Sequence, residues 1–220
     1  MKKTIKVYRD LMGANEVWAQ KTRNLLQEKR VTMLNIIGSP GCGKTTLLEQ
    51  TVGRLPDIRF AVLEGDVETT RDAERLDALK IPVCQLLTDG ACHLEAKLVH
   101  HALRDLSLDD LDLVIVENVG NLVCPAEFDV GEQAKIAVLS VTEGEDKPAK
   151  YPLLFREAAA VVLTKIDLLP HIPFKLDECL DCLARVHGDI PILQVSAVAG
   201  TGMEQWTRLL RSRHDPSVSL

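Results

Sequence analysis

The fold is decided by residues 32–45, which read TMLNIIGSPGCGKT. The first half is an apolar run typical of a buried strand, and the second half, Gly38 to Thr45, fits the phosphate-loop pattern G-x-x-x-x-G-K-[ST]. Glycines let such a loop curl so that successive backbone N–H groups converge on phosphate oxygens at the positive end of the following helix. Because a helix-compatible stretch follows, the segment predicts a P-loop nucleotide hydrolase rather than a Gly-rich turn with a chance lysine.

The side chains of this loop have two expected roles. Lys44 is expected to reach the β- and γ-phosphates and to act in catalysis, and Thr45 is expected to ligate Mg²⁺. Cys42 is interpreted as a tolerated small side chain, although its place beside a helix amino terminus could lower its pKa. The nucleotide contacts of the loop are assigned to Gly38, Gly41, Cys42, Gly43, Lys44, Thr45 and Thr46.

Outside the loop, short Val-, Ile- and Leu-rich runs alternate with polar, helix-compatible stretches, which is the mark of a parallel sheet covered on both faces. Strands are predicted at Thr32–Ile37, Arg59–Leu63, Val83–Leu87, Asp112–Val116, Ile136–Val141, Ala160–Leu163 and Ile192–Val195. Helices are predicted at Lys44–Gly53, Thr70–Leu79, Cys92–Leu106, Tyr151–Glu157, Lys175–Val186 and Met203–Arg211. The chain is therefore an α/β P-loop NTPase with a mostly parallel central sheet of about seven strands flanked by helices.

The amino-terminal residues are expected to form a helix that lies on the main domain. The segment Ala14–Lys29 is polar, with spaced apolar positions at Val17, Leu25 and Leu26. We therefore divide the chain into an N-terminal helical extension, residues 1–30, and one P-loop (G) domain, residues 31–220.

Composition indicates an ordinary globular protein. Hydrophobic residues make up 46% and charged residues 26%, and no apolar run approaches the roughly 18 residues of a membrane helix. The basic start lacks the apolar core of a signal peptide, so a cytoplasmic location is expected and a membrane partner is not. The formal charge of −6 gives no basic footprint for nucleic acid. Six cysteines without a secretion signal are interpreted as thiols or metal ligands rather than a disulfide framework.

Carboxylates follow two of the predicted strands. Glu117 comes directly after a strand and shortly before Gly120, where other P-loop proteins place an acidic residue for Mg²⁺, so Glu117 is a candidate catalytic residue and metal ligand, acting through water. Asp66 follows the second strand at the same sheet edge and is a second candidate for both roles. Asp72 is a candidate water-positioning residue because it lies near Asp66. Either strand-end carboxylate could instead be a solvated loop charge.

A second nucleotide-binding motif follows a later strand. Thr164, Lys165 and Asp167 fit the N/T-K-x-D pattern, in which the aspartate accepts hydrogen bonds from the guanine N1–H and exocyclic amine. Adenine does not offer this pair of donors. Ser196 and Ala197, after the last strand, occupy the place where GTPases present a backbone N–H to the guanine oxygen. Together these residues favour GTP over ATP.

Two cysteines and a histidine indicate a separate metal site. Cys92 and His93 open a predicted helix, and Cys124 follows Gly120 by four residues, so all three are expected beside the γ-phosphate. Thiolate and imidazole suit Ni²⁺ and Zn²⁺, whereas Mg²⁺ prefers oxygen. Helical spacing would add His100 as a supplementary ligand. From spacing alone, two buried thiols and a surface histidine remain the favoured interpretation.

Three longer stretches resemble one family. Gly90–Ala96, Glu117–Asp129 and Val141–Pro148 are similar to the hydrogenase/urease nickel incorporation GTPases of the HypB type, and the likeness covers nearly the whole chain. The resemblance implies a dimerising GTPase of slow turnover that helps deliver Ni²⁺ to the large subunit of [NiFe]-hydrogenase together with a partner metallochaperone. It also implies that Cys92, His93 and Cys124 bind Ni²⁺ or Zn²⁺ at the dimer interface.

The chain departs from this family in three ways. It lacks the cysteine-rich amino terminus and the polyhistidine stretch of some members, so nickel storage is not expected. Thr164 stands where Asn is usual, which removes an amide contact. Lys97 stands where some members carry an additional histidine ligand.

Other functions stay open. A urease-type nickel GTPase centres its metal site on a Cys-Pro-His triplet, which is absent here. In a P-loop small-molecule kinase the three metal-site residues would be structural. A metal-binding regulator would use slow hydrolysis only to time complex assembly.

Overall fold

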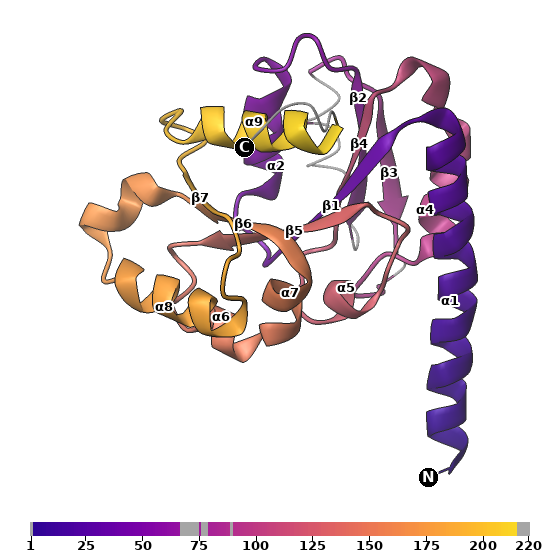
Figure 1. Cartoon of the computed structure of the whole chain (residues 1–220), viewed down its shortest axis with the longest axis horizontal. Coiled ribbons are helices and arrows are strands. Elements are labelled where there is room, and N and C mark those ends of the chain that lie inside the picture. Colours follow the sequence, from indigo (N-terminus) through magenta and orange to yellow (C-terminus); the bar gives the residue numbers. More distant parts are fainter. Residues whose placement is uncertain (1, 67–74, 76–78, 89, 215–220) are drawn as a thin grey trace.

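The computed structural model describes residues 2–66, 75, 79–88 and 90–214, and for residues 2–11 and 66 it describes the backbone alone. Its centre is a seven-stranded sheet in the order β3-β2-β4-β1-β5-β6-β7, with every neighbouring pair parallel (Figure 1). The strands are β1 Thr32–Gly38, β2 Phe60–Asp66, β3 Val83–Leu87, β4 Leu113–Glu117, β5 Ala134–Ser140, β6 Ala158–Thr164 and β7 Ile192–Val195. All seven predicted strands, and the α/β P-loop fold, are confirmed.

Side chains on alternate positions of the central strand face two different cores. Leu34 and Ile36 of β1 pack into the core under one set of helices, whereas Met33 and Ile37 face the opposite side of the sheet. Because both faces are covered, the central strands read as continuous apolar runs rather than alternating ones.

The helices form layers on these two faces (Figure 1). Apolar residues of α2 and α9 cover one face, those of α1 and α4 cover the β2–β4 half of the other, and those of α7 and α8 cover its β5–β6 half. The helices are α1 Lys2–Lys29, α2 Lys44–Val52, α4 Ala96–Asp105, α5 Cys124–Glu127, α6 Lys147–Lys150, α7 Pro152–Glu157, α8 Leu176–Val186 and α9 Met203–His214, with 3-10 turns at Leu108–Asp110 and Ile166–His171.

Three helix predictions need comment. The helix predicted over Cys92–Leu106 begins only at Ala96, because Glu95 is extended, with φ −94° and ψ 147°. The amino-terminal helix starts at Lys2 and not at Ala14. The helix predicted at Thr70–Leu79 lies almost entirely outside the described residues. In the described part of the chain, no helix has the length and apolarity needed to span a membrane.

The C-x-x-C pair lies inside α8. Cys179 and Cys182 are both buried there, and burial raises the pKa of the Cys179 thiol to about 11. Both are free thiols, which agrees with the prediction that the cysteines do not form a disulfide framework.

Candidate functional site

The phosphate loop has the backbone conformation that its glycines predict. Gly41 and Gly43 have φ values of 72° and 99°, which disfavour residues with a Cβ. A Cβ on Gly38 would lie 2.5 Å from the Val138 carbonyl oxygen, so only glycine fits between the loop and β5. The Lys44 ammonium is buried and lies 3.3 Å from the Gly38 carbonyl oxygen, inside the curl where phosphate oxygens are expected.

Cys42 does not have the lowered pKa that its place beside a helix amino terminus could produce. Its side chain is fully buried in the core beneath α2, and burial raises the pKa of the thiol to about 11, although the Lys44 charge opposes that rise. The helix amino terminus does not lower the pKa, because desolvation outweighs the charge effect.

A cavity of about 490 Å³ lies in front of the loop at the carboxyl edge of the sheet. Ligands bind at this edge in parallel α/β sheets. Its cationic groups come from the loop, from the guanine motif and from Arg75, whose guanidinium donates to Thr46 Oγ1 at 3.1 Å and pairs with Glu49. It is lined by Pro40, Gly41, Gly43, Lys44, Thr45, Thr46, Glu64, Gly65, Arg75, Glu117, Asn118, Val119, Gly120 and Lys165.

Two of the predicted magnesium-site side chains meet in this cavity. The Thr45 hydroxyl donates to Glu117 Oε1 at 2.7 Å, and both side chains are buried. Glu64, which sequence reasoning missed, lies on the neighbouring strand in register with Glu117 and is also buried. Sequence reasoning missed Glu64 because the strand was predicted to end at Leu63, whereas β2 continues to Asp66.

The other two carboxylate predictions are not tested. The backbone of Asp66 ends β2 one residue after Gly65, which lines the cavity, but the Asp66 side chain is not described. Asp72 lies outside the described residues. Both assignments stay predictions.

The guanine motif is joined to the phosphate loop by two hydrogen bonds. Thr164 Oγ1 donates to the Cys42 carbonyl oxygen at 2.6 Å, and Lys165 Nζ donates to the Gly41 carbonyl oxygen at 2.7 Å. Thr164 is buried, so its hydroxyl supports the loop, and Asp167 lies exposed in the following 3-10 turn, open to a base.

The segment after β7 is more constrained than predicted. The Ser196 N–H donates to the Thr201 carbonyl oxygen at 2.9 Å, and the Ser196 hydroxyl accepts from the Ala199 N–H at 3.1 Å. Because the Ser196 N–H already has this partner, Ala197 is the residue left to donate a backbone N–H to the guanine oxygen, as predicted for this segment.

The three predicted transition-metal ligands come together from two loops. Cys92 and His93 lie between β3 and α4, and Cys124 begins α5 after β4. The Cys92 and Cys124 sulfurs are 2.9 Å apart, Cys92 Sγ lies 3.7 Å from His93 Nδ1, and one donor atom from each residue falls within 4.8 Å of the others. Because the helix begins only at Ala96, Cys92 and His93 lie in a bend rather than on a helix.

The donor chemistry of this group fits a soft or borderline metal ion. Two sulfurs and an imidazole suit Ni²⁺ or Zn²⁺ and not Mg²⁺. His93 packs its ring on Phe128 with centroids 3.8 Å apart, and its Nε2 is buried without a hydrogen-bond partner among the described residues. Burial lowers the pKa of His93, which favours the neutral imidazole that binds metals, and the Cys92 contact raises the pKa of the Cys124 thiol.

His100 belongs to a different environment. Its Nδ1 lies 3.3 Å from Thr22 Oγ1 of α1, and its ring packs on Trp18 at 5.3 Å. The helical spacing that linked His100 to His93 is wrong, because His93 precedes the helix. Among the described residues, the group able to hold a metal consists of Cys92, His93 and Cys124.

Gly120 and Asn121, which precede Cys124, lie between the metal group and the phosphate loop. The Asn121 side-chain amide donates to the Cys92 carbonyl oxygen at 3.2 Å. One residue earlier, a Cβ on Gly120 would lie 2.9 Å from the Pro40 backbone nitrogen, so the segment after β4 packs closely on the loop. The segment that begins at Gly120 therefore contacts both sites.

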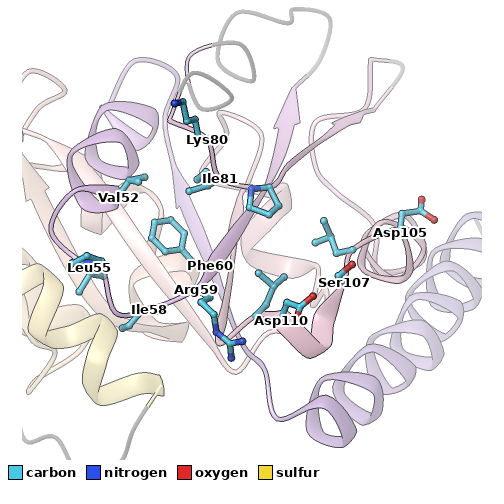
Figure 2. Close-up of a pocket in the computed structure, with 14 residues that line it drawn as sticks. Val52, Leu55, Ile58, Arg59, Phe60, Lys80, Ile81, Asp105, Ser107 and Asp110 are labelled. Carbon is cyan, nitrogen blue, oxygen red and sulfur yellow. The ribbon is translucent and has the colours of Figure 1, made fainter.

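A larger cavity, about 590 Å³, lies at the opposite edge of the sheet (Figure 2). Phe60 begins β2, and Ile81 and Pro82 precede β3, so this cavity opens at the amino ends of the strands. It is mainly apolar and contains no part of the phosphate loop. Its position excludes it as the site for the nucleotide phosphates.

Comparisons with known proteins agree with this geometry. The family described as CobW/HypB/UreG, nucleotide-binding domain, matches residues 32–194. Hydrogenase maturation factor HypB of Escherichia coli K12 is 44% identical over 213 residues, which are 96% of this chain and 73% of that protein. Hydrogenase/urease maturation factor HypB of Helicobacter hepaticus is 40% identical over 199 residues, 89% and 82% of the two chains. The crystal structure of HypB from Helicobacter pylori in complex with nickel matches with a TM-score of 0.89 at 34% identity, covering 94% of this chain and 98% of that one.

Proposed function

Because the chain belongs to the HypB group of the CobW/HypB/UreG family, we propose that it is a GTP-hydrolysing metallochaperone that assists nickel insertion into the large subunit of [NiFe]-hydrogenase. The observation that carries the proposal is the position of Cys92, His93 and Cys124, which lie together at the end of the segment that contacts the phosphate loop. The nickel bound by the similar Helicobacter pylori protein supports the choice of metal. Zn²⁺ suits the same ligands.

The hydrolytic site is assigned from the cavity at the loop. Lys44 and the loop N–H groups hold the β- and γ-phosphates, and Asp167 reads the guanine. Thr45 with Glu117 and Asp66 would hold Mg²⁺, which would neutralise phosphate charge. Water attacks the γ-phosphorus, and the bond to the β–γ bridging oxygen breaks, leaving GDP and phosphate. Asp72 is proposed to position that water.

Nucleotide state is coupled to metal affinity through the segment from Glu117 to Cys124. GTP draws this segment toward the loop, and hydrolysis releases it, so the Cys92–Cys124 separation depends on the γ-phosphate. By linkage, the metal changes nucleotide affinity by the same factor.

The metal group supplies three ligands, whereas four are usual for Zn²⁺. A symmetric homodimer completes the coordination by bringing the same residues across a two-fold axis. We assign residues 31–220 to the GTPase domain and residues 1–30 to a helical extension, with a cytoplasmic location. A second metallochaperone and the hydrogenase large subunit are the expected partners.

The test is a titration of Ni²⁺ and Zn²⁺ into the apo protein, the GDP complex and the complex with a non-hydrolysable GTP analogue, with mass measured in parallel. We expect nucleotide-dependent affinity and a shift from monomer to dimer, both weakened by Cys92→Ala and by Cys124→Ala. Cys84→Ala is the matched control, because this half-buried thiol lies on β3 outside the metal group. Equal metal affinity in all three nucleotide states would remove the coupling and leave a GTPase with another purpose.

A further inference from the structure

One side chain of α1 contacts both segments that carry the metal ligands. Asn15 is 8% exposed, its Nδ2 donates to the Asp129 carbonyl oxygen at 2.7 Å, and its Oδ1 accepts from the Ala96 N–H at 2.9 Å. Ala96 follows His93 by three residues, and Asp129 follows Cys124 by five. The amide thus spans the two ligand-bearing segments from a third element.

The contact with Ala96 completes the start of α4. The first N–H groups of a helix have no partner within the helix, and the α4 N-cap residue, Glu95, makes no side-chain capping bond. Asn15 supplies the acceptor from another helix. Because the bond is buried, its loss would leave the Ala96 N–H without this partner, which disfavours the present position of the Cys92–His93 segment.

The contact with Asp129 is reinforced by a second residue of α1. The Arg23 guanidinium pairs with the Asp129 carboxylate at 2.6 Å, while the other carboxylate oxygen accepts from the Gly131 N–H at 2.7 Å. Phe128, the residue before Asp129, carries the ring against which His93 packs. Fixing Asp129 on α1 therefore also fixes the support of the His93 ring.

We propose that Asn15 is a positioning residue of the metal centre, which holds the Cys92–His93 and Cys124–Phe128 segments at the separation that lets one ion bind both. The inference rests on the proposed metal-binding function. It assigns α1, for which the sequence predicted only a position on the main domain, a direct part in building the site.

The experiment measures Ni²⁺ binding to the full chain by the thiolate-to-nickel charge-transfer absorption, together with GDP affinity. Asn15→Ala is expected to weaken Ni²⁺ binding roughly 10- to 100-fold, as loss of residues that support metal ligands generally does, and to change the absorption band. GDP affinity, measured on the metal-free protein, stays unchanged, because Asn15 is absent from the lining of the nucleotide cavity. Asn24→Ala is the matched control on the same helix, since Asn24 is exposed and bonds Gln20 of the same helix.

Asn15→Asp separates positioning from a packing defect. It is nearly isosteric, so it leaves no void, but it replaces the donor to Asp129 by an acceptor. We expect this variant also to lose Ni²⁺ affinity while it binds GDP normally. Unchanged Ni²⁺ affinity and an unchanged band in both Asn15 variants would overturn the inference, provided Cys92→Ala abolishes binding. Wild-type Ni²⁺ binding by Cys92→Ala would instead overturn the proposed metal site itself.

Discussion

Replacing Thr164 by Val tests the link between base recognition and phosphate binding. The substitution keeps the shape of the side chain and removes the hydroxyl that donates to the Cys42 carbonyl oxygen at 2.6 Å in a buried position. A buried polar group that loses its partner costs about 1–3 kcal/mol. If the phosphate-binding shape of the loop depends on this bond, GDP affinity falls by up to the same free energy, which is about 5- to 150-fold.

Two measurements separate the effect of the substitution on stability from its effect on GDP affinity. Chemical denaturation gives the change in stability, and titration with a fluorescent GDP analogue gives the change in affinity. Thr164→Ser retains the hydroxyl and should bind GDP nearly as the wild type does. Thr207→Val is the control, because its hydroxyl bonds the Glu204 carbonyl oxygen on the exposed side of α9. A Thr164→Val protein that is less stable but binds GDP normally would refute the link between the motif and the loop.

Two further predictions follow from the packing of the loop and the buried thiols. Gly120→Ala would push a Cβ to 2.9 Å from the Pro40 backbone nitrogen. We therefore expect GTP affinity and turnover, measured by GTP binding and phosphate release, to fall by about tenfold or more, on the scale of 1.4 kcal/mol. Gly53→Ala is the control and should change neither, because the space around Gly53 is open. Burial raises the pKa of both Cys42 and Cys179 from 9.0 to about 11, so the folded state loses stability as pH rises through that range. Urea denaturation at pH 8 to 11 should show this loss of stability. The loss should be smaller in Cys42→Ala and in Cys179→Ala if these thiols cause it.

The strands and the phosphate loop could be predicted because their signals are local. An apolar run, two glycines at the turn and a following lysine are read within fourteen residues, and the hydrogen-bonding needs of that loop leave little choice of fold. The three proposed metal ligands required the family resemblance, since Cys92 and Cys124 are separated by 32 positions and spacing alone favoured two buried thiols and a surface histidine.

What failed depended on contacts between distant segments. The start of α4 was placed at Cys92 because a helical pattern continues through the bend, whereas Leu94 packs against Gly65 and an α1 side chain bonds the Ala96 N–H. Thr164 was expected only to lose a contact, because its bond to the Cys42 carbonyl spans 122 residues. Burial of Cys42, which raises the pKa of its thiol, likewise depends on neighbours from other strands.

The strand order determines which parts of the sheet a bound metal ion would connect. Within the described residues, β3 lies at the edge of the sheet and pairs with β2 alone, while the Cys124 segment follows β4, on the other side of β2. An ion bound by Cys92 and Cys124 would therefore connect the segment after β3, the edge strand, to the segment after β4, an interior strand. Amide hydrogens of β3 should exchange more slowly when the ion is present, and release of the ion should increase local opening of β3.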